Sequence, residues 1–325
     1  MVFKKLLGAL GVGGPSVDTV LQPAPALPGG PLSGEVRLRG GGSEVTVERI
    51  TLLLVARVEA EGQDEEREGT AVLERFFVGG GFRLAEGAEH TVPFTVTLPW
   101  ETPFTELHGQ PLGLVLGIRT ELEVAGARDK GDLDALAVAP LPAQEAVLEA
   151  FGQLGYGFRS ADLELGHIRG TGQQLPCYQE IEMVPPAGEA HAVNEIEVTF
   201  LAAPAGLEVV IEADKRAGLH SEGHDTVHRF TTSHHTVAQA DRNAEVDAWL
   251  QQVTGARAAH AAPYAYAQDG HHDAHAHDGH HRSGPGAGAV VAGVAAGAAV
   301  GVVGGMVAAE VIDEIGDAFE DDEEE

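Results

Sequence analysis

Residues 92–98 read Val-Pro-Phe-Thr-Val-Thr-Leu, and this stretch decides the fold class. Apolar side chains fill every second position, and threonine or proline fills the positions between them. Because successive side chains of a β-strand point to opposite faces of the sheet, this period predicts a strand with one buried face. Residues 114–124 repeat the pattern over about 11 residues, which is roughly 37 Å of extended chain and enough to cross a whole sandwich.

The same period of two extends outward from these stretches, from residue 16 to about residue 139. Apolar runs at residues 17–21 and 44–58 are separated from the others by clusters of turn-forming residues. These clusters lie at residues 40–43, 79–81, 99–103 and 126–131. Strands at this spacing, with no long helix between them, are typical of an antiparallel sandwich. We therefore expect residues 1–139 to form an N-terminal β-sandwich domain.

One helical pattern interrupts the strands. Residues 142–154 carry large apolar side chains at helical spacing, and Gly155 follows where a left-handed C-cap is favoured. A further helix is expected at residues 243–253. Strand patterns occur between the two helices, at residues 158–165, 178–184, 194–201, 207–213 and 227–232. The chain is therefore predicted to be all-β, with two antiparallel sandwich domains, 1–139 and 140–255, joined near a short linker helix.

The amino-acid composition argues against several classes of ligand and site. The 325 residues include 20 Lys and Arg against 50 Asp and Glu, a formal net charge of −30. This charge repels phosphate backbones and argues against nucleic-acid binding. A single cysteine, Cys177, excludes an intrachain disulfide and a cysteine-based zinc site, and its strand context predicts a buried structural thiol. No HExxH, GxSxG or P-loop motif occurs, so we expect neither catalytic residues nor a cofactor.

An ordered set of motifs resembles the bacterial sporulation-control protein family, which has an arrestin-like fold. The matching stretches are residues 3–6 (FKKL), 17–21 (VDTVL), 28–36 (PGGPLSGEV), 89–103 (EHTVPFTVTLPWETP), 118–124 (IRTELEV), 130–134 (KGDLD), 147–155 (VLEAFGQLG) and 175–185 (LPCYQEIEMVP). The resemblance implies a cytoplasmic, non-enzymatic scaffold that binds other proteins in the control of sporulation or cell differentiation. It implies no catalytic residues. Arrestin-type sandwiches offer sheet faces and edge strands to partners, and strand addition at an edge is the route we expect.

A histidine- and aspartate-rich linker is expected at residues 256–285. Its six closely spaced histidines could bind a divalent metal weakly through imidazole nitrogens: His271, His272, His275, His277, His280 and His281. A plain flexible linker is the alternative, because Gly, Ala and Asp pre-organise no ligands. A second group of histidines precedes the last helix and fits either a loop and strand or a metal site: His220, His224, His228, His234 and His235.

The low-complexity tail, residues 286–325, is expected to be helical or disordered and to end in an acidic run. Glycines recur in it every four residues, at Gly293, Gly297, Gly301 and Gly305, which on a helix form a stripe for close association. A helix over residues 289–309 would be about 31 Å long, close to the ~30 Å of a bilayer core, although valine and alanine are only weakly apolar. Homo-oligomerisation, peripheral membrane contact and a disordered linker all remain open. A membrane-associated or self-assembling structural protein is therefore the alternative function.

Overall fold

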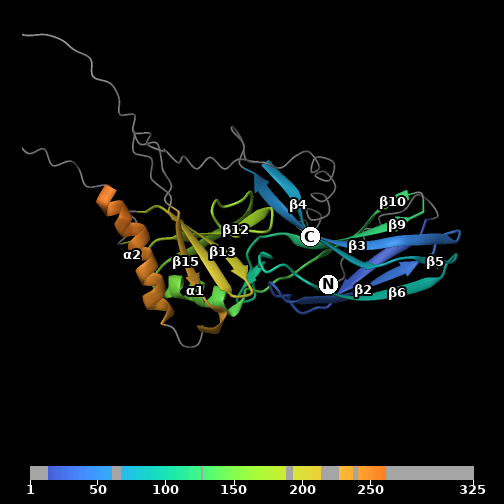
Figure 1. Ribbon diagram of the computed structural model, residues 1–325, viewed down its shortest axis with the longest axis horizontal. Coiled ribbons are helices and arrows are strands. Elements are labelled where there is room, and N and C mark those ends of the chain that lie inside the picture. Colours follow the sequence, from blue (N-terminus) through green and yellow to red (C-terminus); the bar gives the residue numbers. More distant parts are fainter. Residues whose placement is uncertain are drawn as a thin grey trace, which may run out of the picture.

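The computed structural model describes residues 14–60, 67–125, 127–187, 193–213, 227–236 and 241–260. The predicted metal ligands at 271–281 and the association glycines at 293–305 lie outside these ranges, so both assignments stay predictions. Within the described ranges, the chain forms two lobes at opposite ends of an elongated molecule (Figure 1).

The first lobe is a sandwich of two antiparallel sheets. One sheet has the strand order β1-β2-β6, and the facing sheet places β10, β9 and β3 side by side, with β4 and β5 along the other edge of β3. The strands are β1 (Ser16–Leu21), β2 (Pro31–Arg39), β3 (Val45–Ala60), β4 (Arg67–Gly79), β5 (Phe82–Leu84), β6 (Glu89–Thr97), β9 (Leu116–Val124) and β10 (Ala127–Ala135). Along β6, Phe94 is buried whereas Thr95 and Thr97 are exposed. The predicted strand with one buried face is confirmed.

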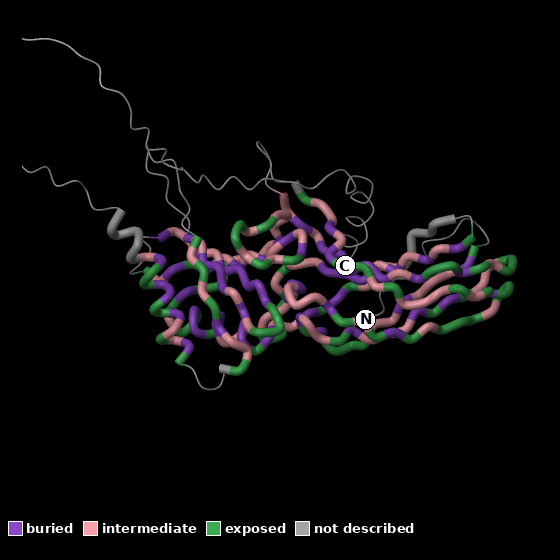
Figure 2. The backbone as a smooth tube through the Cα atoms, in the orientation of Figure 1, coloured by how far each residue is buried: buried purple, intermediate pink, exposed green. Residues whose placement is uncertain are grey.

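Strand β3 belongs to both lobes. It is 16 residues long, and its residues 52–56 are all buried, so both of its faces are covered there. At its carboxyl end, Glu59 pairs in parallel with Glu164 of β11 (Gly157–Leu165) in the second lobe. One sheet therefore runs through the molecule in the order β10-β9-β3-β11-β12-β13-β14-β15. Buried residues follow this sheet from one lobe into the other (Figure 2).

The second lobe is an antiparallel sheet covered on one face by helices. After β11 come β12 (Cys177–Val184), β13 (Ile196–Ala203), β14 (Gly206–Ala213) and β15 (His228–Thr232). Helices α1 (Pro142–Gln153) and α2 (Arg242–His260) pack against each other, and Trp249 of α2 stacks on Phe230 of β15 with ring centroids 5.0 Å apart. In the described ranges, helices rather than a second sheet form the facing layer, a difference from the expected sandwich. The mainly β composition agrees with the prediction.

Helix α1 begins and ends where the sequence predicts. Pro142 occupies its first turn, where no backbone N–H is needed for helical hydrogen bonds. Val147 and Phe151 are fully buried against the second lobe. Gly155 adopts a φ of 93°, the left-handed conformation that ends the helix. Helix α2 extends beyond the predicted residues 243–253 at both ends.

The connection after β6 holds the two lobes together. We call its contact residues the interlobe joint: Trp100, Glu101, Phe104, Gln179 and His234. The Trp100 and His234 rings stack with centroids 5.4 Å apart. The buried Gln179 amide accepts a hydrogen bond from the Phe104 N–H (3.1 Å) and donates one to the Phe104 carbonyl (3.0 Å). The Glu101 carboxylate accepts hydrogen bonds from the backbone N–H groups of residues 174 and 175.

Candidate functional site

The candidate site lies on the face of the second-lobe sheet that is turned away from the helices. Ile181, Val198 and Ile211 point into the core, so the residues between them on each strand point to the other face. Five carboxylates lie together on that face, and we call them the acidic face: Asp162, Glu164, Glu180, Glu197 and Glu212.

The strand register sets several of these carboxylates directly opposite one another. Glu197 lies between Glu182 on one neighbouring strand and Glu212 on the other. Asp162 lies opposite Glu180. Like charges at directly opposed positions destabilise a sheet, so the rest of the lobe must stabilise this arrangement. Groups of charges held together in this way are characteristic of functional sites.

These surroundings shift the pKa of Glu180. Burial raises its pKa to about 9, and the negative charges of Glu197, Asp162, Glu164 and Glu212 act in the same direction. Glu180 therefore carries a proton at neutral pH. A cation placed on the acidic face would favour the ionised form, so binding of a positive group can be coupled to release of a proton.

Two arginines form ion pairs beside the acidic face. Arg159 contacts Glu182, with its Nε 3.5 Å from a carboxylate oxygen, and it also pairs with Glu195. Arg229 of β15 pairs with Glu208 of β14. Guanidinium groups can therefore contact carboxylates on this sheet, which shows how a basic side chain of a partner could be held.

A pocket of about 520 Å³ opens where the two lobes meet. Its lining includes Glu101 of the interlobe joint, Gly172 of the loop before β12, and the β13–β14 hairpin. Glu208 and Thr231, which also line it, are opposed across β14 and β15 and share the face that carries the acidic residues. The pocket is therefore at one end of the acidic face, and its volume is in the range of sites that hold small ligands or several side chains.

The histidines predicted before the last helix are not brought together as a metal site in the described ranges. His228 lies on β15 and stacks on Phe230, whereas His234 donates a hydrogen bond from Nε2 to the Ala203 carbonyl and stacks on Trp100. The convergent groups of potential metal ligands found among the described residues contain none of the three located there, His228, His234 and His235. His220 and His224 lie outside the described ranges.

Cys177 is buried, as predicted, at the start of β12. Burial, with a smaller effect of the nearby Glu101 charge, raises the pKa of its thiol to about 12. The thiol therefore stays protonated near neutral pH and is unsuited to nucleophilic catalysis. No described helix combines the length and the apolar character that a membrane span requires.

Strand β4 provides the longest edge available for strand addition in the described structure, since its strand partner there is β3 alone. Its Phe77 is 66% exposed. However, two bulges interrupt its pairing with β3, and the exposed Glu74 and Arg75 lie between them. Bulges and charges of this kind protect an edge from added strands. The acidic face is therefore the better candidate for a partner.

Sequence patterns did not reveal the acidic face. Its five carboxylates come from four strands, and their separation along the chain follows no motif. The alternation of acidic with apolar residues, as at 195–198 and again at 180–183, is a local signal, and it predicts a polar sheet face. Only the register of all four strands places these charges side by side.

Comparison with known proteins identifies the chain's relatives. The model of the SpoOM protein family matches residues 3–217. The sporulation-control protein spo0M of Bacillus subtilis (strain 168) is 37% identical over 217 residues, which cover 66% of this chain and 81% of the relative. The crystal structure of Spo0M, the sporulation control protein from Bacillus subtilis, matches with a TM-score of 0.64 and 30% identity and covers 76% of this chain and 100% of that chain. The resemblance inferred from the sequence motifs is thereby confirmed, and the chain belongs to the SpoOM family of sporulation-control proteins.

Proposed function

We propose that the protein is a cytoplasmic, non-enzymatic regulator of sporulation that binds a basic segment of a partner protein. The observation that carries the proposal is the acidic face, together with the pocket at the lobe junction whose lining includes Glu101 and Glu208. Lysine or arginine side chains entering there would offset the repulsion between opposed carboxylates. The family membership supports the regulatory role, and the net charge of −30 disfavours nucleic acid as the ligand.

Charge complementarity also gives this interaction a recognisable signature. Binding between an acidic and a basic surface weakens as salt concentration rises, because ions screen exposed charges. A bound cation lowers the pKa of Glu180, so the protonated side chain releases a proton on binding. A contact made mainly by apolar surface would show neither effect.

To test this proposal, a photo-reactive amino acid replaces Thr231, which lines the pocket, and crosslinking is carried out in the native host. The same residue at Thr91, exposed on β6 of the first lobe, is the control. A partner captured from position 231 and not from position 91 is then purified. Its binding is measured by calorimetry in buffers with different ionisation enthalpies, which reports the proton released.

Charge-reversal variants then distinguish an effect of charge at the proposed binding site from an effect of the protein's net charge. Glu212→Lys should weaken binding at least about tenfold, because it removes and reverses one charge at the site. Glu48→Lys changes the net charge equally on an exposed position of β3 and should leave affinity unchanged. Equal effects of both variants, or chemical turnover of the partner by the purified protein, would contradict the proposal.

The tail carries the alternative function. Self-association or peripheral membrane contact through Gly293, Gly297, Gly301 and Gly305 depends on residues outside the described ranges and stays a prediction. Fractionation of cells that express the full chain and a truncation after residue 255 tests it. Loss of membrane or oligomer fractions only in the truncated protein would support it, whereas identical distributions would reject it.

A further inference from the structure

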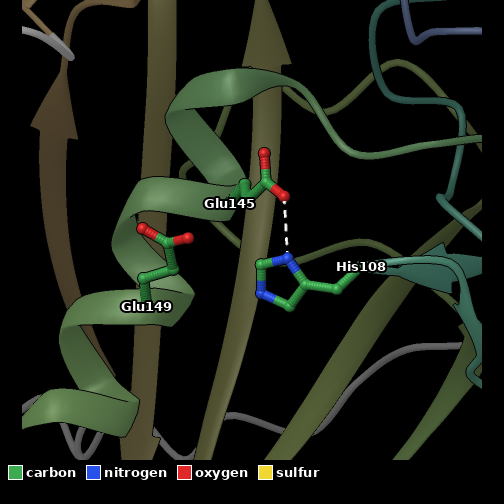
Figure 3. Close-up of side chains that lie close together, drawn as sticks. All are labelled: His108, Glu145 and Glu149. Carbon is green, nitrogen blue, oxygen red and sulfur yellow. Dashed lines mark ion pairs between the residues drawn. The ribbon is translucent and has the colours of Figure 1, made fainter.

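A histidine and two glutamates converge where the segment after β6 meets α1 (Figure 3). His108 occupies the turn between the short strands β7 (Glu106–Leu107) and β8 (Gln110–Pro111), and Glu145 and Glu149 lie one turn apart on α1. The His108 Nδ1 atom is 3.0 Å from Glu145 Oε1. One ligand atom from each of the three residues lies within 4.8 Å of the other two.

The three side chains are held by two ordered elements. A spacing of four residues places Glu145 and Glu149 on the same face of α1, and the buried Val147 and Phe151 fix the opposite face of that helix. His108 has a φ of 51° and is followed by Gly109 with a φ of 72°. Consecutive positive φ values characterise the tight two-residue hairpin turn, so the turn fixes the direction in which the imidazole projects.

We propose that His108, Glu145 and Glu149 bind a divalent transition-metal ion, with Zn²⁺ as the preferred ion. One imidazole and two carboxylates form a ligand set that Zn²⁺ accepts, with bond lengths of about 2.0–2.2 Å. Small side-chain rotations bring atoms that lie within 4.8 Å of one another onto such a sphere. The residues are partly exposed, so water can complete a tetrahedral shell.

A metal at this position would connect the two lobes. The β7–β8 hairpin belongs to the chain segment between β6 and β9 of the first lobe, whereas α1 packs into the second lobe. A bound ion would therefore fix the hairpin against α1. This inference is independent of the proposed binding of a basic segment, because the metal ligands lie outside the acidic face and outside its pocket.

The test needs a local readout, because the six histidines at 271–281 also offer imidazole ligands to zinc. The full chain, first stripped of metal with a chelator, is titrated with Zn²⁺ alone, and nitrogen NMR follows the individual histidine rings. The resonance absent from His108→Ala identifies His108. Its ring nitrogens should shift during the titration, and so should the amide of Gly109.

Glu149→Gln distinguishes a metal site from a simple ion pair. In the described structure Glu149 forms no ion pair with His108, so a plain His108–Glu145 contact would not depend on it. The variant should raise the zinc concentration at half-saturation of the His108 signal by about tenfold or more. His167→Ala, which removes an exposed histidine elsewhere, should leave that value unchanged. A His108 signal that ignores saturating zinc, or an unchanged midpoint in Glu149→Gln, would overturn the proposal.

Discussion

At the residue scale, Gly29 and Trp100 show how closely the connection after β6 is packed. Gly29 has a φ of 69°, and a Cβ atom built on it would lie 2.4 Å from Cδ2 of the Trp100 ring. The indole therefore rests directly on the glycine backbone. Trp100 also stacks on His234, so its position links the turn before β2 to the second lobe.

Gly29→Ala should lower the free energy of unfolding by roughly 2–4 kcal/mol, since both left-handed strain and overpacking oppose the methyl group. Gly81→Ala is the matched control, because Gly81 also has a positive φ, 77°, but a Cβ there meets no atom within 4 Å. We expect it to cost about 1 kcal/mol. Urea unfolding measures both, and equal losses would show that the Trp100 contact is unimportant.

Glu180 makes stability depend on pH. Its pKa in the folded chain, about 9, is above the ordinary value of 4.5, so the folded state binds the proton more tightly. Stability should therefore fall as pH rises between these two values. Glu180→Gln should raise the free energy of unfolding under mildly alkaline conditions by at least about 1.4 kcal/mol, the equivalent of one pKa unit.

The same variant should have little effect near pH 4, where both states are protonated. Thermal unfolding of parent and variant across this pH range provides the measurement. Glu48→Gln, at an exposed position on β3, is the control and should follow the parent profile. A Glu180→Gln profile parallel to that of the parent would show that this carboxyl does not titrate as described.

At the element scale, Gln179 attaches β12 to the segment after β6. Gln179→Leu should lower the free energy of unfolding by about 2–4 kcal/mol, because it leaves the N–H and carbonyl of Phe104 buried without their partner. Gln251→Leu removes an exposed hydrogen bond on α2 and should cost less than about 0.5 kcal/mol. Denaturant unfolding of both variants compares them. A loss no larger than that of Gln251→Leu would contradict the role given to Gln179.

The elements differ in how far the sequence predicts them. β6, β9 and α1 were predictable because each presents one face to a core, so its apolar residues follow the period of a strand or helix. β3 was predictable as a strand. Its contribution to the second lobe was not predictable, because the pairing of Glu59 with Glu164 joins positions about a hundred residues apart. The same reason hides the acidic face and the approach of His108 to α1.

At the scale of the whole molecule, the domains predicted at residues 1–139 and 140–255 share a sheet and the interlobe joint, in which Phe104 and Gln179 are buried. We expect the described lobes to unfold together. Separating them would break the β3–β11 contact and the hydrogen bond from the Phe104 N–H to the Gln179 side chain. Calorimetry should show a single transition whose van 't Hoff and calorimetric enthalpies agree. Two resolved transitions would instead show that the domains are independent folding units.

The shared strand β3 also constrains how such a chain can be inherited. Recombination at residue 140 would separate the coding sequence of β10, β9 and β3 from that of β11–β15. Each product would then contain only part of the sheet and would expose unpaired strand edges that favour aggregation. Lineages carrying this architecture should therefore pass on both lobes as one indivisible gene segment.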